Sequence, residues 1–285
     1  MRRAPSYLLF ILLLLLLSRG VAEPQRLPMI GIQGADDRVI TETQAYPWSA
    51  IGRVNSILGS FCTGTVIGPR KVLTAAHCLW NRRMGRWLPS CALHFVAGYR
   101  RGEYLIHSLV ESFRIAPGYR PPARGKQPDL TSDWAILHLA EEVTPLTGQM
   151  PVSILTAAEE QALKTRELEL VQAGYSRDRQ YVLTHHRGCL MRGRADKERL
   201  ILHECDATFG DSGSPLLLKG AGDYRLIGVH LGTKNTDGRG VGMALSARVF
   251  QKATEKAAPP LPKDQPIKAC SLASPVQLAS ARRPD

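Results

Sequence analysis

Three short stretches carry residue types that together could activate a nucleophile. They are Thr74-Ala75-Ala76-His77-Cys78, Asp133-Trp134-Ala135-Ile136-Leu137 and Gly210-Asp211-Ser212-Gly213-Ser214-Pro215. A serine hydroxyl is a weak nucleophile at neutral pH, so a neutral imidazole must take its proton during attack on a carbonyl carbon. A buried carboxylate then holds the imidazole in one tautomer, and glycines beside the serine let backbone N–H groups reach the oxyanion. The candidate catalytic residues are His77, Asp133 and Ser212, with the amides of Gly210 and Ser212 as oxyanion donors.

A second carboxylate, Asp129, competes with Asp133 because it lies only four residues earlier. Asp133 leads directly into an apolar run that predicts a strand, which would place its side chain against the histidine. We therefore favour Asp133. Asp211 is interpreted as a structural partner that orders the serine loop.

At these residues the chain resembles the trypsin/chymotrypsin-like serine proteases, whose catalytic residues occur in the same order. The α/β-hydrolases instead show Ser, Asp, His around Gly-x-Ser-x-Gly, and here Ser214 replaces the final glycine. The stretches 34–40, 45–51 and 60–69 are similar to the start of mature V8-like bacterial glutamyl endopeptidases. The resemblance implies an all-β fold of two packed six-stranded antiparallel β-barrels with a C-terminal helix. It also implies a serine endopeptidase that forms an acyl-enzyme on Ser212.

Three residues are candidates for the substrate pocket: Asp206, Ala207 and His230. Asp206 occupies the position of the pocket acid in trypsin-like enzymes and, taken alone, predicts cleavage after Arg or Lys. His230 lies in a stretch resembling the one where V8-like enzymes place the histidine that reads glutamate. The alternative is a buried strand histidine with a backbone partner. Ala207 replaces a hydroxyl residue of those enzymes, a lost hydrogen bond worth roughly 1.5–3 kcal/mol. The sequence therefore slightly favours glutamate over Arg or Lys as the residue before the cleaved bond.

Six cysteines in an exported chain predict three disulfides. The family resemblance implies the pair Cys62 and Cys78 beside the histidine. Cys189 and Cys205 lie just upstream of the serine loop and would brace the pocket, which leaves Cys91 and Cys270 by exclusion. No Cys-x-x-Cys or His-Glu-x-x-His spacing supports a metal site, and no motif requires a cofactor.

Residues 1–22 are interpreted as a secretory signal. Arg2 and Arg3 precede the ten apolar residues Leu8–Leu17, and Gly20-Val21-Ala22 offers small residues for cleavage. Ten apolar residues are too few to span a bilayer, which needs about 20. We therefore expect a secreted chain, extracellular or periplasmic, with no stable membrane anchor.

Beyond the signal we expect an N-terminal segment and first barrel over 23–145, a second barrel and helix over 146–257, and a proline-rich tail over 258–285. Short apolar or alternating runs between turn residues predict strands. They include Ser49–Val54, Phe61–Ile67, Lys71–Thr74, Leu93–Ala97, Leu105–Ile115, Trp134–Leu139, Glu167–Tyr175, Ile201–Cys205, Pro215–Leu218 and Arg225–Leu231. Helices are expected over Ala157–Lys164 and Ala247–Ala257.

The formal net charge of +12 falls to +9 without the three arginines Arg2, Arg3 and Arg19. The remaining basic residues are scattered, so we expect a solvated surface rather than a nucleic-acid site. The expected partners are polypeptide substrates, and the expected state is a monomer. The alternatives are a catalytically silent homologue that acts as an extracellular binding module, and an esterase with the same acyl chemistry.

Overall fold

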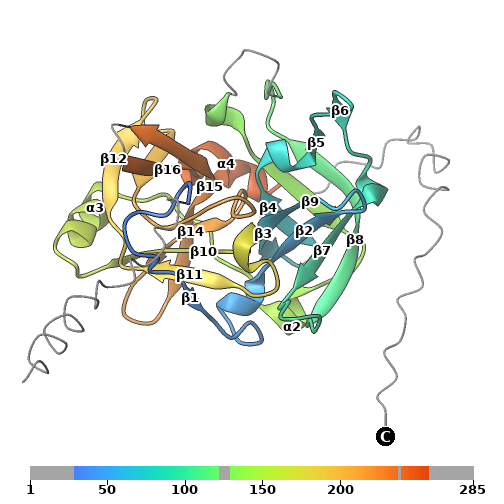
Figure 1. The fold of residues 1–285 in the computed structure, drawn as a ribbon, viewed down its shortest axis with the longest axis horizontal. Coiled ribbons are helices and arrows are strands. Elements are labelled where there is room, and N and C mark those ends of the chain that lie inside the picture. The colour runs from blue at the N-terminus through green and yellow to red at the C-terminus, as the bar shows by residue number, and fades with distance from the viewer. Residues whose placement is uncertain (1–28, 122–128, 237–238, 257–285) are drawn as a thin grey trace, which may run out of the picture.

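The structure, a computed structural model, describes residues 29–121, 129–236 and 239–256. These residues form two β-sheet units that lie side by side (Figure 1). One cluster of buried apolar side chains draws residues from both units, among them Ile51 and Leu137 of the first and Val171 and Val229 of the second. The predicted signal over 1–22 and the tail over 258–285 lie outside the described residues. No helix in the described ranges is long and apolar enough to cross a membrane.

The first unit is a closed antiparallel barrel of six strands, as the sequence predicts. In pairing order they are β2 (Ile51–Ser56), β3 (Phe61–Gly68), β4 (Lys71–Thr74), β9 (Ala135–Leu139), β8 (Ile106–Ile115) and β7 (Leu93–Ala97). Pairing of β7 with β2 closes the ring. All five side chains of β9 are buried, which explains the apolar run that follows Asp133. A small ribbon of β5 (Trp80–Asn81) and β6 (Arg86–Trp87) follows the histidine segment.

The second unit is a curled sheet of eight strands, two more than expected. Its order is β1 (Val39–Ile40), β11 (Thr184–Arg187), β10 (Glu169–Gly174), β14 (Pro215–Lys219), β15 (Tyr224–Thr236), β16 (Arg239–Ser246), β13 (Leu200–His203) and β12 (Met191–Ala195). The short strand β1 comes from the N-terminal segment and extends one edge by pairing with β11. The strands β11 and β12 are joined by residues 188–190, yet no ladder between them closes the described sheet.

Within the described ranges three α-helices accompany the sheets: α2 (Thr144–Thr147), α3 (Ala157–Lys164) and α4 (Ala247–Thr254). The start of α3 is fixed by a capping box in which the side chains of Thr156 and Glu159 each accept the other's backbone N–H. The predicted C-terminal helix is α4, which buries Phe250. Lys71 and Arg114 of the barrel donate to carbonyl groups in its last turn. The helix therefore ties the second unit to the first.

The all-β class and the C-terminal helix are thus confirmed. The sequence did not predict strands β11, β12 and β16, because polar and charged residues dominate β11 and because glycines and charged residues interrupt the apolar pattern of β12 and β16. The strand β16 forms because it pairs with both β13 and β15, and this pairing is long-range information that the local pattern lacks.

Candidate active site

His77 lies directly after β4, in a short 3-10 turn over Ala76–Leu79. Thr74, the last residue of β4, donates its hydroxyl hydrogen to a backbone oxygen of β3 at 2.8 Å. A disulfide between Cys62 of β3 and Cys78 of the turn provides a covalent link at the same place. The hydroxyl contact and the bridge together fix the backbone of His77 against the barrel.

Asp133 binds His77 through both carboxylate oxygens. Its Oδ2 lies 2.7 Å from Nδ1 of His77, and its Oδ1 accepts the backbone N–H of His77 at 2.8 Å. Asp133 is only 1% exposed. Because the carboxylate is an acceptor, the neutral imidazole carries its hydrogen on Nδ1 and keeps Nε2 as the acceptor. Asp129 instead caps the preceding turn by accepting bonds from Thr131 and Ser132.

Ser212 lies in a tight loop between β13 and β14 that only glycines can form. The φ angles of Gly210 and Gly213 are +99° and +83°. A Cβ at Gly210 would lie 2.5 Å from a backbone oxygen, and a Cβ at Gly213 would lie 2.2 Å from the hydroxyl of Thr74. The backbone oxygen of Ser212 accepts the N–H of Thr63 at 2.9 Å, which locks the loop onto the first barrel.

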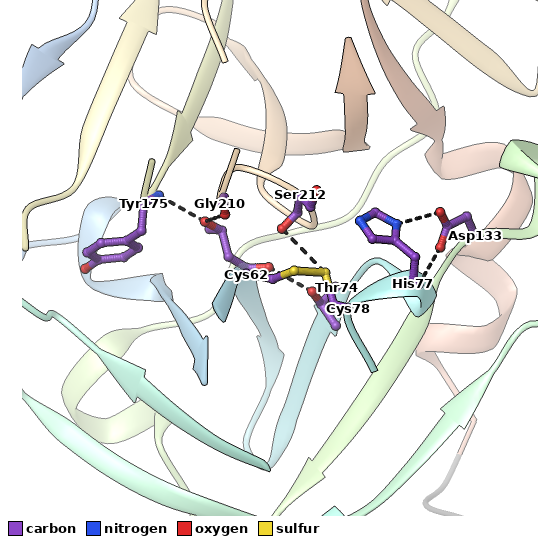
Figure 2. The surroundings of a disulfide bond; sticks show 9 residues. Cys62, Thr74, His77, Cys78, Asp133, Tyr175, Gly210 and Ser212 are labelled. Carbon is purple, nitrogen blue, oxygen red and sulfur yellow. Dashed lines mark hydrogen bonds and ion pairs between the residues drawn. A yellow bond between two sulfur atoms is a disulfide. The ribbon is translucent and has the colours of Figure 1, made fainter. Parts of the chain in front are cut away.

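The side chains of His77, Asp133 and Ser212 line one groove of about 660 Å³ between the two units. Figure 2 shows Ser212 and Asp133 on opposite sides of the His77 imidazole. Within the described residues the Ser212 hydroxyl makes no hydrogen bond, and neither do the amides of Gly210 and Ser212. Hydrogen bonds of this kind often tighten only when substrate binds. The groove therefore offers a hydroxyl, an imidazole acceptor and two free N–H donors to a bound molecule.

His230 reaches the groove from β15 as the outer member of a buried histidine pair. The backbone N–H of Cys205 donates to Nδ1 of His203 at 3.2 Å, and Nε2 of His203 lies 3.1 Å from Nδ1 of His230. Nε2 of His203 must therefore carry the hydrogen, which leaves Nε2–H of His230 as a donor. Burial, and after it the proximity of His77, lower the pKa of His230 to about 3, so His230 is neutral at pH 7.

The sequence reasoning missed His203. Its pKa lies well below the usual value, first because of burial and then because of His230. Its ring occupies space above β16 that exists only because residue 242 is glycine: a Cβ there would lie 2.3 Å from the ring. The register pairs His203 with Gly242 and His230 with Ala244. Only this three-strand pairing brings the two histidines together.

Asp206 does not line the groove. It is fully buried, and its two oxygens accept the backbone N–H groups of Gln33 and Asp37 at 2.8 and 2.9 Å. The sequence predicted a position in the pocket because of the distance of Asp206 from Ser212. In the structure its carboxylate instead binds backbone N–H groups of the N-terminal segment. The neighbouring Ala207 does line the groove, together with Thr208 and Thr233, which the sequence reasoning did not single out.

Asp211 is fully buried beside the serine loop. One oxygen accepts the Ser176 hydroxyl and the Thr208 N–H, both at 2.7 Å, and the other has no partner in the described part of the chain. Burial raises the pKa of Asp211 to about 6, against the opposing effect of those two hydrogen bonds. These contacts are those of a group that orders the loop.

The structure contains the disulfides Cys62–Cys78 and Cys189–Cys205. The third expected pair involves Cys270, which lies outside the described residues. In the described ranges one group of three possible metal ligands occurs, formed by Cys62, His77 and Cys78. Its two sulfurs are bonded to each other, so they are not the thiolates that a metal would require.

The chain is similar to known proteases. A family model described as Trypsin matches residues 37–253. A glutamyl endopeptidase of Bacillus licheniformis is 32% identical over 126 residues, which is 44% of this chain and 37% of that protein. Melanization protease 1 of Drosophila melanogaster is 26% identical over 241 residues, which is 68% of this chain and 58% of that protein. The chain thus covers less than two thirds of the length of both relatives.

Two solved structures share the fold. The structure of a Glu endopeptidase in complex with MPD aligns with a TM-score of 0.62 and 20% identity, over 79% of this chain and all of that one. The protease Anisep from Arthrobacter nicotinovorans aligns with a TM-score of 0.57 and 16% identity, over 77% of this chain and all of that one.

A closed β-barrel and a curled β-sheet that enclose a serine, a histidine and an aspartate define the class of trypsin-like serine proteases. The chain belongs to the trypsin family. The resemblance to bacterial glutamyl endopeptidases is also confirmed as a similarity.

Proposed function

We propose that this chain is an exported serine endopeptidase that cleaves peptide bonds through an acyl-enzyme on Ser212. Nε2 of His77 takes the Ser212 proton as the oxygen attacks the carbonyl carbon, and the resulting imidazolium is stabilised by Asp133. The amides of Gly210 and Ser212 bind the oxyanion. His77 then returns the proton to the leaving amine, and water releases the acyl group by the same route. The observation that carries the proposal is the 2.7 Å contact of His77 with Asp133 inside the groove that Ser212 lines.

We further propose a V8-like preference for glutamate before the cleaved bond. His230 offers a neutral N–H donor to the groove, and Thr208 and Thr233 supply hydroxyl groups that Ala207 lacks. A hydrogen bond to a carboxylate is shorter and stronger than one between neutral groups. Asp206, the residue that would favour Arg or Lys, has both oxygens taken by backbone N–H groups. A glutamate side chain is therefore the better partner for this pocket.

Export is supported by the two disulfides, because such bonds persist in oxidising compartments. The similarity to a bacterial glutamyl endopeptidase is consistent with export.

The proposal is tested with a fluorophosphonate probe, which acylates only an activated serine. We expect labelling of the wild-type protein at Ser212 and none of a folded Ser212→Ala variant. Both proteins are then incubated with a mixed peptide library. We expect the wild type to cut after glutamate and the Ser212→Ala variant to make no cuts. A folded wild-type protein without labelling or cuts would contradict the proposal, and ester turnover with intact peptides would favour the esterase alternative.

A further inference from the structure

One end of the groove is lined by two aromatic rings and an arginine. These residues are Phe61 of β3, Phe209 of the serine loop and Arg177 of the turn that follows β10. The guanidinium carbon of Arg177 lies 5.8 Å from the ring centroid of Phe209, and Phe209 is 60% exposed. Such a position over an aromatic ring is a favourable place for a cation. The ring therefore supports the guanidinium at the mouth of the groove.

The charge of Arg177 is not neutralised within the described part of the chain. Its neighbour Asp178 is engaged by Arg38 at 2.7 Å. Arg177 itself is exposed and makes no ion pair with a described residue. The backbone of Arg177 is fixed independently of the side chain, because its N–H donates to the Phe209 oxygen. The backbone of Arg177 is thus anchored next to Gly210, and its guanidinium has no anionic partner among the described residues.

The rest of the groove offers no competing anion. Among its described lining residues Asp133 is the only carboxylate, and both of its oxygens are bound to His77. His230 is neutral because burial lowers the pKa of its imidazole to about 3. Arg82 also lines the groove, so an acidic side chain entering it would meet the guanidinium groups of Arg177 and Arg82 and no free carboxylate among the described lining residues.

The location of Arg177 assigns it to the leaving-group side of the cleaved bond. In the proposed reaction the side chain before the bond occupies the recess at Ala207, His230 and Thr233. Figure 2 shows Gly210 and Cys62 on the other side of Ser212 from His77 and Asp133. In the proposed reaction the chain beyond the cleaved bond leaves on this side of Ser212, where the Phe61 ring and the backbone nitrogen of Arg177 lie next to Gly210.

We propose that Arg177 forms a subsite for an acidic side chain one or two residues after the cleaved bond. The preferred substrates are then acidic peptide segments, with a carboxylate on the leaving-group side as well as in the recess. Arginine suits this role because its planar guanidinium binds a carboxylate through two parallel hydrogen bonds. This inference rests on the proposed endopeptidase function and adds a second recognition point to it.

The test uses fluorogenic peptides with glutamate before the cleaved bond and Glu, Gln or Lys at the first or second position after it. For the wild type we expect kcat/KM for Glu to exceed that for Lys by about 3- to 10-fold at the better position, as for a partly exposed ion pair. The Arg177→Gln variant should abolish the difference, and Arg177→Glu should reverse it. Added salt should shrink the difference, because exposed charges are screened.

The control variant Arg187→Gln removes the same charge at an exposed residue of β11 that is paired with Glu169 and does not line the groove. It should keep the wild-type preference. Cleavage without any preference, or a preference that survives in Arg177→Gln, would overturn the subsite and leave the endopeptidase function intact. A wild-type protein that neither reacts with the fluorophosphonate nor cleaves any peptide would overturn both.

Discussion

The closed barrel and the curled sheet contribute to the groove in different ways. The barrel supplies His77 and Asp133, which are bound to each other by two hydrogen bonds at the ends of its strands. The sheet supplies the Ser212 loop and the recess, and it holds them with glycines and with fully buried ionisable groups. His230 is neutral in that environment, and the pKa of Asp211 is raised to about 6. The unit proposed to move the proton thus relies on two side chains paired with each other, whereas the unit proposed to read substrate relies on buried groups whose pKa values are shifted by burial.

The largest effect is expected from Asp133→Asn, which tests the barrel's contribution. The amide can donate a hydrogen bond to Nδ1, so the imidazole would adopt the wrong tautomer and lose its acceptor towards Ser212. We expect kcat to fall by about 10⁴-fold with little change in folding. The measurement is peptide hydrolysis together with thermal unfolding. The control Asp129→Asn alters the adjacent turn and should keep kcat within about threefold; equal losses in both variants would contradict the assignment of Asp133.

The next largest effect is expected on stability, from replacing a glycine of the Ser212 loop in the second unit. We expect Gly213→Ala to destabilise the protein by about 3 kcal/mol or more, because the new Cβ would overlap the Thr74 hydroxyl and the backbone at φ of +83°. The control Gly222→Ala has nothing within 4 Å of its Cβ and no unusual φ. It should be neutral or stabilise by up to about 1 kcal/mol. Urea unfolding of both variants gives the comparison, and equal stabilities would show that the loop can relax.

Two variants distinguish the role of His230, which lines the recess, from that of Asp206, which does not. We expect His230→Gln to lower kcat/KM for cleavage after glutamate by about 10-fold or more, since one donor to a carboxylate is worth roughly 1.5–3 kcal/mol. Asp206→Asn should reduce stability without changing the residue preferred before the cleaved bond, because its carboxylate faces the N-terminal segment. Peptide-library cleavage measures both. A loss of cleavage after Arg or Lys in Asp206→Asn alone would reverse the assignment.

The smallest effect is a pH dependence of stability that arises from the buried histidines. Below pH 6.5 the unfolded chain protonates its histidines, whereas His230 stays neutral in the fold down to about pH 3. The stabilisation is therefore full above pH 6.5 and is lost as the pH falls through this window, by about 1.4 kcal/mol per pH unit for one histidine. The raised pKa of Asp211 acts in the opposite direction, because the fold takes up that proton between about pH 6 and its unfolded value.

Urea unfolding at pH 5 and pH 7 measures this dependence. The free energy of unfolding should fall less between pH 7 and pH 5 in the His230→Gln variant than in the wild type. The reason is that the unfolded variant takes up one proton fewer over this range. An unchanged difference would mean that His230 is protonated in the fold.

Much of the fold follows from local patterns that the sequence displays. The apolar run after Asp133 is buried strand β9, and Ala157–Lys164 is helix α3 with its capping residues in place. The strands of the second unit were harder to predict, because Arg239–Ser246 contains glycines and gains its stability from neighbours on both sides. Strand β1 could not be predicted, since its partner β11 lies far along the chain.

By itself, the amino-acid sequence determined the family, the order of the three candidate catalytic residues and the glycines that their loop needs, because these depend on residue type and close spacing. The sequence also favoured Asp133 over Asp129, whereas the tertiary structure alone decided where Asp206 points and which histidine lies behind His230. Those outcomes depend on strand register and on backbone groups far away in the chain. Hydrogen bonds from residues 33 and 37 turned a residue in a pocket-acid position into an anchor for the N-terminal segment.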